Sequence, residues 1–386
     1  MSDELERISA CAMNGIFGYE PRIARRIIDE LGSCRALFGL GENELRGIIS
    51  PGSKFYGRVN RSALDDARRE LCRLEAEGYR FLPISDPAYP PALRDCEDAP
   101  VGLYLRSETP PEELFRPPMV AIVGTRDVSP YGREWCARIV EALSTASERP
   151  AIVSGLAFGV DITAHRAAIQ HGLKTIAVLP TGIDEVYPLQ HAPAAACLGR
   201  TPGCGLITDF PPGTSPQQVT FLRRNRIIAG LARATILVES KVKGGGMMTA
   251  RLAFEYGREV FVLPGRIDDP RSGGCNLLVR NKVAEPITSV ADLPAQLGLG
   301  GSALRRKASL EKLLEEKYAG ALPEDRGALV RVALIVKSRR GIGVEEISRE
   351  LGMSYSETIA CVSTLESDGF LSQDLLQRCI MNMKIA

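Results

Sequence analysis

Short apolar runs and amphipathic segments alternate through the central part of the chain. The runs have the length and β-branched content of buried strands, and the segments between them carry hydrophobic residues at helical spacing. In the first such segment, Tyr131, Trp135, Ile139 and Leu143 recur every four residues along one helical face. This alternation predicts an α/β fold, a doubly wound and mostly parallel sheet covered on both faces. The runs are MVAIVG (119–124), AIVSG (151–155), TIAVLP (175–180), GLIT (205–208), TILVE (235–239) and EVFVLP (259–264).

The N-terminal part has a different pattern. Residues 1–80 have helix-like spacing with glycines at the turns, which predicts a small helical domain ahead of a sheet domain at 81–295. Within it, GYEPRIARRIIDELGS (18–33) is faintly similar to a helix-hairpin-helix phosphate clamp, although a bundle used for packing or partner contact is favoured. A strand is expected at 81–85, and the proline-rich segment 86–105 is expected to be irregular.

The pattern of the C-terminal part again predicts mainly helices. A linker at 296–325, with its own charged helix SLEKLLEEKY (309–318), is expected to lead into a further domain at 326–386. There, three helical segments followed by a strand pair predict a winged helix-turn-helix.

Composition indicates a globular protein of two or three domains. The chain has 386 residues, of which 25% are charged and 45% hydrophobic. No apolar run approaches the roughly 20 residues of a membrane span, and MSDELERI at the start lacks a signal-peptide pattern, so no membrane association is expected. The ten cysteines form no C-x-x-C pair and are typical of reduced thiols, which favours the cytoplasm and neither disulfides nor a metal site.

Positive charge is concentrated in the predicted sheet domain. The whole chain carries a net charge of only +1, but residues 119–290 contain 19 Lys and Arg against 14 Asp and Glu. This surplus has meaning only if it converges in space.

Three predicted strand ends carry groups that suit an anion. The first strand ends in Gly124-Thr125-Arg126, and the second in Ser154-Gly155. The fifth is followed by residues 241–246, KVKGGG, which lead into a helix that carries Thr249. Free backbone N–H groups and the positive end of a helix dipole favour anions at such turns, and ligands of doubly wound sheets bind at this edge. Neither G-x-G-x-x-G nor G-x-x-x-x-G-K-[ST] is present, so no nucleotide cofactor is expected.

An arginine cluster opens the helical segment FLRRNRIIAGLA (221–232). On a helical wheel Arg223 and Arg226 point away from the apolar residues, and we expect both to contact the ligand. Arg224 falls within the apolar arc, so a buried structural arginine and a phosphate contact are equally open.

Support for a catalytic centre is weak. The chain has three histidines without metal-ligand spacing, and His165 is interpreted as structural. Asp161 is a plausible helix N-cap, and although Asp161 or Glu255 could act on a bound nucleotide, no second acid lies at an evident spacing. We therefore expect a binding protein and not an enzyme.

Seven blocks of sequence resemble the DNA processing protein A (DprA, or Smf) family. The resemblance implies an extended Rossmann-like domain that binds single-stranded DNA (ssDNA) without strong sequence preference and protects it. It also implies a homodimer that helps to load the RecA recombinase, in natural transformation where the host is competent, with no cofactor and no catalytic turnover. The blocks are DPAYPPAL with APVGLYL (86–105), VAIVGTR (120–126), VSGLAFGVDITAHRAAI (153–169), TIAVLPTGIDEVYP (175–188), FLRRNRIIAGLA (221–232), GGGMMTARLAFEYGREVFVLPG (244–265) and SGGCNLLV (272–279).

Carried over position by position, the family's ssDNA pocket falls on eleven residues. They are Gly124, Thr125, Arg126, Ser154, Gly155, Arg223, Arg224, Asn225, Arg226, Lys243 and Thr249.

The chain departs from the family pattern at several places. Leu222 stands where proline is usual, and Gly244 to Met248 replace a serine-containing turn. The presumed recognition helix of the winged helix, 354–368, contains no lysine or arginine, so protein contacts or autoregulation are favoured over duplex binding.

These residues predict electrostatic capture of the strand. If Arg126, Arg223, Arg226 and Lys243 each neutralise one phosphate, the log–log salt slope is roughly −3 per protomer, and Phe221 is a candidate to stack one base. One alternative is a nucleotide-processing enzyme, because residues 244–265 are also similar to the nucleotide loop of phosphoribohydrolases, although the first proline and the properly placed acid of that signature are missing. A third is a scaffold that only recruits RecA.

Overall fold

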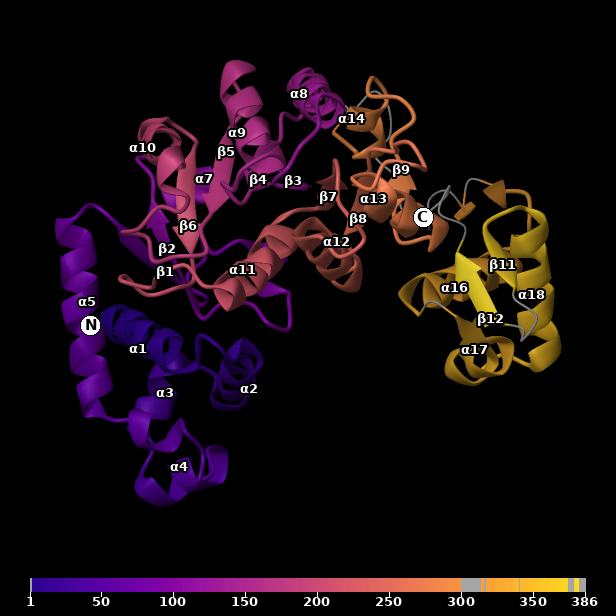
Figure 1. Cartoon of the computed structure of the whole chain (residues 1–386). Helices are drawn as coiled ribbons and strands as arrows, with labels where there is room; N and C mark the ends of the chain where they lie inside the picture. The colour runs from indigo at the N-terminus through magenta and orange to yellow at the C-terminus, as the bar shows by residue number, and fades with distance from the viewer. Residues whose placement is uncertain (1, 300–313, 316, 340, 374–377, 382–386) are drawn as a thin grey trace. The chain divides into compact units, whose positions relative to one another are not determined.

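The computed structural model describes residues 2–299, 314–315, 317–339, 341–373 and 378–381. The chain forms two compact units, Met1–Gly300 and Gly301–Ala386 (Figure 1). Within the described residues, no helix is long and apolar enough to cross a membrane.

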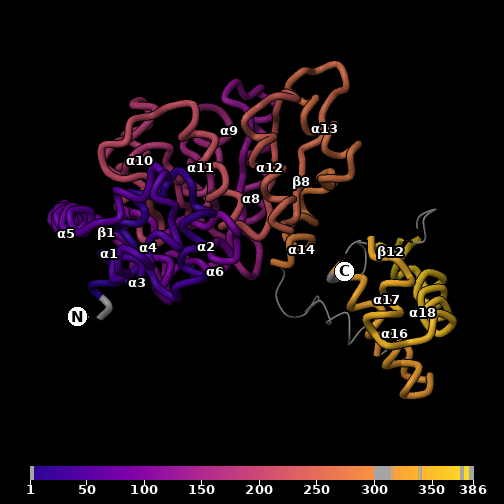
Figure 2. Tube along the Cα trace, turned by 90° about the horizontal axis from the view of Figure 1, so that it is seen from below, coloured from indigo at the N-terminus to yellow at the C-terminus, as the bar shows by residue number. Residues whose placement is uncertain are grey.

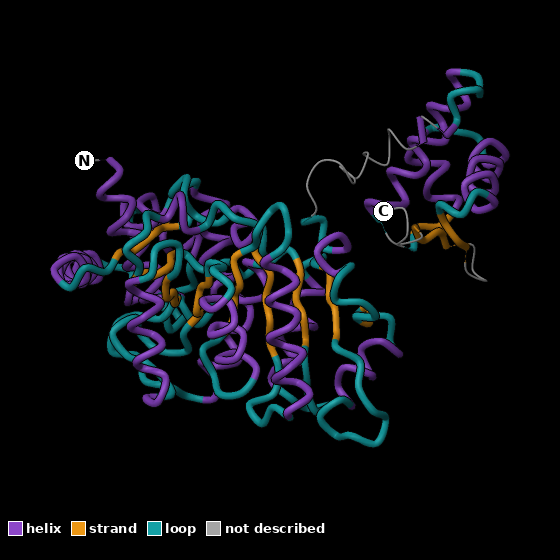
Figure 3. Tube along the Cα trace, turned by 90° about the horizontal axis from the view of Figure 1, so that it is seen from above, coloured by secondary structure: helices purple, strands orange, loops and turns teal. Residues whose placement is uncertain are grey.

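A nine-stranded sheet is the centre of the first unit, with the order β1-β2-β6-β5-β4-β3-β7-β8-β9. Strands from β6 to β9 in this order are all parallel, whereas β2 pairs antiparallel with both β1 and β6. Figure 3 shows the strands side by side with helices running along them. Their bounds are β1 Arg80–Pro83, β2 Gly102–Arg106, β3 Met119–Val123, β4 Ala151–Ser154, β5 Thr175–Val178, β6 Gly205–Thr208, β7 Ala234–Leu237, β8 Glu259–Val262 and β9 Glu285–Pro286.

Helices cover both faces of this sheet because alternate side chains of each strand point to opposite sides. On β3, Val120 and Ile122 pack under α8 (Pro130–Ser144) and α9 (Val160–Gln170). Ala121 and Val123 belong to the core beneath α11 (Gln218–Leu231) and α12 (Gly245–Glu255). Figure 1 shows the two layers on either side of the strands. The predicted doubly wound, mostly parallel α/β fold is therefore confirmed.

The N-terminal segment is helical, as predicted, and belongs to the same compact unit as the sheet. Its helices α1 and α5 contact β1, and the group lies at the β1 end of the sheet (Figure 2). The expectation that 86–105 is irregular was wrong in part: Gly102 to Arg106 form β2, which bridges β1 and the parallel strands. The helices of the N-terminal segment are α1 Ser2–Phe17, α2 Pro21–Leu31, α3 Cys34–Gly39, α4 Glu42–Ile48 and α5 Arg61–Ala76. Two short helices, α6 Pro91–Arg94 and α7 Pro111–Leu114, follow on either side of β2.

Among the described residues of the second unit, α16, α17 and α18 share a core with a small antiparallel sheet, β10-β12-β11. These elements lie in the segment for which a winged helix is predicted, and the assignment stays a prediction. The helix expected over 309–318 lies mostly outside the described residues. The remaining bounds are α10 Ala192–Arg200, α13 Gly273–Arg280, α14 Leu293–Gln296, α16 Pro323–Ser338, β10 Ile342–Gly343, α17 Val344–Leu351, α18 Tyr355–Ser367, β11 Leu371–Gln373 and β12 Arg378–Met381.

Candidate functional site

A cavity of about 700 Å³ opens at the carboxyl ends of β3 and β7. These strands are neighbours in the sheet, but the chain leaves β3 towards β4 and returns to β7 only later. They therefore flank the topological switch point, where ligands of open α/β sheets bind. We call this cavity the switch-point pocket. Of the predicted site residues it is lined by Gly124, Thr125, Arg126, Arg224, Asn225, Lys243 and Thr249.

The turn after β3 is held against the segment after β7. The Thr125 backbone N–H donates to the Glu239 carbonyl at 2.7 Å. A Cβ at position 124 would lie 2.5 Å from Val160 Cγ2 and 2.9 Å from that carbonyl, so only glycine fits. The absence of a side chain brings the two strand ends together and leaves backbone at the pocket wall.

The N-terminus of α12 forms another part of the wall. Its N-cap, Gly244, has no side chain with which to cap the first turn. Gly246 packs closely against Gly124: a Cβ added to Gly246 would lie 3.2 Å from the Gly124 Cα. The first N–H groups of an eleven-residue helix thus face the pocket with the positive end of its dipole, which favours an anion.

Three exposed cations line the switch-point pocket: Arg126, Lys241 and Lys243. Neither lysine has an ion-pair or hydrogen-bond partner for its side chain among the residues that the structure describes. The Arg126 guanidinium lies 4.8 Å from the centroid of the Phe221 ring, and Tyr187 meets that ring edge-on at 5.4 Å. The pocket therefore combines exposed positive charge with an aromatic surface.

Arg224 and Asp161 form the charged floor of the pocket. Both are buried, and Arg224 Nη1 donates to the Val178 carbonyl at 3.1 Å. Burial lowers the pKa of Arg224 to about 10 against the opposing effect of Asp161, so the guanidinium stays charged at neutral pH. Burial raises the pKa of Asp161, and Arg224 is the main opposing influence. The N-cap of α9 is Gly159, so the prediction that Asp161 caps this helix was wrong.

The turn after β4 supports this floor without lining the pocket. Ser154 is buried, and its hydroxyl donates to the Ile122 carbonyl at 2.6 Å. A Cβ at Gly155 would lie 1.4 Å from Arg224 Nη1. Glycine at position 155 therefore makes room for the Arg224 guanidinium. The sequence had left open whether Arg224 is a buried structural arginine or a phosphate contact. Arg224 is buried and lines the floor of the cavity.

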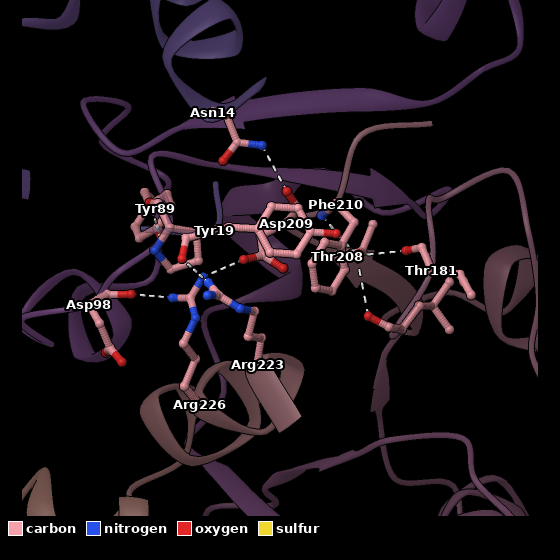
Figure 4. A network of polar contacts seen from close by, with 12 residues as sticks. Asn14, Tyr19, Tyr89, Asp98, Thr181, Thr208, Asp209, Phe210, Arg223 and Arg226 are labelled. Carbon is pink, nitrogen blue, oxygen red and sulfur yellow. Dashed lines mark hydrogen bonds and ion pairs between the residues drawn. The ribbon is translucent and has the colours of Figure 1, made fainter. Parts of the chain in front are cut away.

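Arg223 and Arg226 do not line the pocket. Figure 4 shows both side chains reaching from α11 towards Tyr19, Asp98 and Asp209. Arg226 is buried, forms an ion pair with Asp209 and donates to the Asp98 carbonyl. Arg223 donates to the Tyr19 carbonyl and lies over the Tyr19 ring. The expected placement of these two arginines with Arg126 and Lys243 in one groove is corrected: their partners are provided by the protein itself.

The sequence prediction missed Glu239, which links the pocket to α8. Its buried carboxylate accepts hydrogen bonds from the Ser129 N–H at 2.9 Å and the Ser129 hydroxyl at 2.5 Å, at the N-terminus of α8. A glutamate at the end of an apolar run was the available signal, because a buried strand end tolerates a carboxylate only with such donors. Lys241 lies in the turn 241–246 that the sequence indicated as an anion site, but it was not among the eleven residues carried over from the family.

His165 is structural, in line with its interpretation from the sequence. It is buried on α9, with Nδ1 2.7 Å from the Thr175 hydroxyl, and its Nε2 has no hydrogen-bond partner among the described residues. Because the Thr175 hydroxyl donates to the Ile152 carbonyl, the ring must donate through Nδ1. Burial is the main cause that lowers the pKa of His165, to about 3.

A first prediction follows for acid stability. The unfolded chain takes up a proton at His165 below about pH 6.5 and the folded chain does not, so stability falls as pH drops from about 6.5 towards 3. Between pH 7 and pH 5, we expect the free energy of unfolding of His165→Gln to fall by about 2 kcal/mol less than that of wild type. Urea unfolding followed by Trp135, the single tryptophan, measures this. His171→Gln, at the end of the same helix, is the control, and equal losses in wild type and His165→Gln would refute the prediction.

The fold and the pocket define an α/β protein with a cavity lined by exposed cations at the switch point of its sheet. The chain belongs to the family described as DNA recombination-mediator protein A, whose model matches residues 80–298.

Curated relatives agree with this assignment. The chain is 39% identical over 232 residues to "Protein Smf" of Escherichia coli, a match that covers 59% of this chain and 60% of that protein. It is 37% identical over 233 residues to "DNA processing protein DprA" of Streptococcus pneumoniae, covering 60% of this chain and 78% of that protein.

Solved structures of relatives show the same fold. The structure of DNA processing protein A from Streptococcus pneumoniae has a TM-score of 0.64 and 30% identity, and covers 76% of this chain and 97% of that chain. A structure of DNA processing protein A from Helicobacter pylori, concerned with its single-stranded DNA binding mode, has a TM-score of 0.50 and 30% identity, over 57% of this chain and 95% of that chain.

Proposed function

We propose that this protein is a recombination mediator that binds and protects ssDNA in the switch-point pocket. The observation that carries the proposal is the convergence of Arg126, Lys241 and Lys243 with the free N-terminus of α12 around one cavity. Phosphates are the anions that such a helix end and such cations bind. The similarity to the Helicobacter pylori protein, which is described with its ssDNA binding mode, supports the same ligand here.

In the proposed complex the strand is held by its backbone. The three exposed cations each neutralise about one phosphate, so the log–log salt slope for the pocket is about −2, smaller than the sequence alone suggested because Arg223 and Arg226 are engaged elsewhere. Arg224, Asn225, Thr249 and the turn at Gly124-Thr125 form the inner contact surface. Ser154 and Gly155 support Arg224, and the Phe221 ring offers one base a stacking face.

The cellular role that we propose is the one that membership of this family suggests. We infer that the protein acts in the cytoplasm as a homodimer, that it helps RecA to load on the strand, and that it serves natural transformation where the host is competent. The 219 residues of the family match cover the whole sheet with its pocket, and the family is named for recombination mediation. For α18, which has an acidic first turn and no basic residue in its last turn, we propose protein contacts.

Binding without turnover fits the acids of the pocket. Asp127 is in an ion pair with Arg271 at 2.9 Å, and buried Asp161 is opposed by Arg224. Neither Asp127 nor Asp161 therefore forms, with a second unpaired carboxylate, the acid–base pair that hydrolysis of a bound nucleotide would use. Release of adenine from AMP by the purified protein would instead favour the nucleotide-processing alternative.

Fluorescence anisotropy with labelled oligonucleotides tests the proposal. We expect wild type to bind a single strand more tightly than a duplex of equal length, and Arg126→Ala to lose about tenfold in affinity for the single strand, the value of one charged hydrogen bond. Arg138→Ala is the control, because Arg138 is exposed on α8, outside the pocket, and is paired with Glu134. Wild type that does not bind single strands, or Arg126→Ala that binds like wild type, would contradict the proposal.

A further inference from the structure

A second cavity, of about 530 Å³, lies beside the switch-point pocket on the α8 and α9 face of the sheet. We call it the arginine groove. Arg126 and Asp127 line both cavities, so the turn after β3 is the ridge between them. Other lining residues are Arg133 from α8, Arg166 from α9, Phe158 from the turn before α9, and His191 from the short 3-10 helix Leu189–His191 that precedes α10.

The ridge and the groove are rigidly connected through the backbone. Gly159 has φ +78°, and a Cβ there would lie 2.3 Å from the Thr125 carbonyl oxygen and 2.6 Å from the Arg126 carbonyl oxygen. The Val160 N–H donates to the Thr125 carbonyl at 3.2 Å. The start of α9 therefore packs directly against the loop that carries Arg126, so the two cavities adjoin across this contact.

The groove carries an excess of unpaired positive charge. Arg133 and Arg166 are exposed, and their guanidinium groups have no partner within the described ranges of the chain. Asp127 is the one carboxylate among the described residues that line it, and Arg271 already binds its Oδ2 at 2.9 Å. A polyanion is the partner whose charge complements such a surface.

An aromatic ring stands in the same groove. Phe158 is 42% exposed, and it packs edge-to-face on the buried His191 with ring centroids 4.7 Å apart. His191 is itself fixed, because its Nδ1 donates to the Leu156 carbonyl at 2.7 Å. An exposed, positioned aromatic ring between arginines is the arrangement on which single-stranded nucleic acids stack a base.

We propose that the arginine groove is a second ssDNA subsite, continuous with the switch-point pocket. The strand passes over Arg126 from the pocket into the groove, where Arg133 and Arg166 bind phosphates and Phe158 stacks a base. This inference rests on the proposed function, since it extends the same strand. A strand is favoured over an acidic peptide because the groove shares Arg126 with the pocket and a strand provides regularly spaced charges beside a base.

Oligonucleotides of two lengths test the proposal with the full chain. A strand of about 4 nucleotides occupies the pocket alone, and one of about 16 nucleotides reaches both cavities. We expect Arg133→Ala/Arg166→Ala to bind the long strand more than about tenfold more weakly at about 0.1 M salt, with a salt slope smaller by about 1.4. Its affinity for the short strand should equal that of wild type. Arg116→Ala/Arg138→Ala, which removes two exposed arginines outside both cavities, should match wild type with either strand.

Substitution of the aromatic ring provides an independent readout. Phe158→Ala should weaken binding of the long strand by about fivefold or more, whereas Phe158→Tyr should retain it. Equal binding of the long strand by wild type and the groove variants overturns the second subsite and leaves the proposed function standing. A loss in the Arg116/Arg138 control as large as in the groove variant also overturns it. Wild type that binds neither strand refutes the proposed function itself.

Discussion

Replacing Asp209 by alanine is expected to lower the free energy of unfolding of the first unit by about 3–5 kcal/mol. Asp209 and Arg226 have side chains only 2% and 7% exposed, and they form an ion pair (Figure 4). Without the carboxylate, the Arg226 guanidinium keeps its desolvation cost and loses its counter-charge. The Asp98 carbonyl, which also accepts from Arg226, does not replace that charge.

The same network joins the N-terminal helices to the helix that carries Arg224. Asn14 of α1 donates to the Asp209 carbonyl at 2.8 Å, and Arg223 of α11 binds the Tyr19 carbonyl in the turn after α1. Loss of Asp209 therefore acts on the attachment of α1 as well as on α11.

Urea unfolding followed by Trp135, which lies on α8 of this unit, measures the effect. The double variant Arg226→Met/Asp209→Leu removes both charges. We expect it to be more stable than Arg226→Met alone or Asp209→Leu alone, because replacing both members of a buried pair by apolar groups leaves no isolated charge. The account of the pair fails if Asp209→Ala lies within about 1 kcal/mol of wild type, or if the double variant loses the sum of the single losses.

Reversal of two pocket charges is expected to reduce ssDNA affinity by about two orders of magnitude at about 0.1 M salt. In Arg126→Glu/Lys243→Glu, two phosphate contacts become two repulsions, while the rest of the pocket is unchanged. Both side chains are exposed, so the stability of the fold should be preserved. Arg116→Glu/Arg138→Glu changes the net charge equally but outside the pocket, and we expect a loss of less than about tenfold. Equal losses in the two double variants would show that net charge, and not the pocket, determines binding.

The fold was predictable where short buried strands alternate with amphipathic helices along the chain. The parallel strands from β3 to β8 are buried on both faces, apart from Glu259 at the start of β8, and each appears as an apolar run in the sequence. The edge strand β9 was missed because its two residues are exposed and form no such run. β2 was missed because proline residues precede it and its pairing partners, β1 and β6, are distant in the chain. A strand of this kind is defined by its neighbours more than by its own pattern.

The pocket was predictable in its backbone and exposed cations. Gly124, Arg126 and Lys243 converge because the ends of adjacent parallel strands must meet at one edge. The helical wheel failed for Arg226 because it divides a helix into one buried and one solvated face. α11 is enclosed on more than one side, packing on both the sheet and α6, and Arg226 finds Asp209 and Asp98, which no local pattern connects to it.

The arginine groove shows the same limit. Arg133 and Arg166 lie on different helices, and only the packing of α8 against α9 places them around Phe158. Each residue alone is typical of a solvated helix surface.

A salt titration with a strand of about 4 nucleotides tests the central claim most directly, namely that exposed cations around the switch-point pocket hold the strand by its phosphates. We predict a log–log slope of about −2 for wild type and of about −0.7 for Lys241→Ala/Lys243→Ala, in which Arg126 is the remaining exposed cation among the described residues that line the pocket. Wild-type affinity that does not change with salt, or the same slope in wild type and in this variant, would contradict the account.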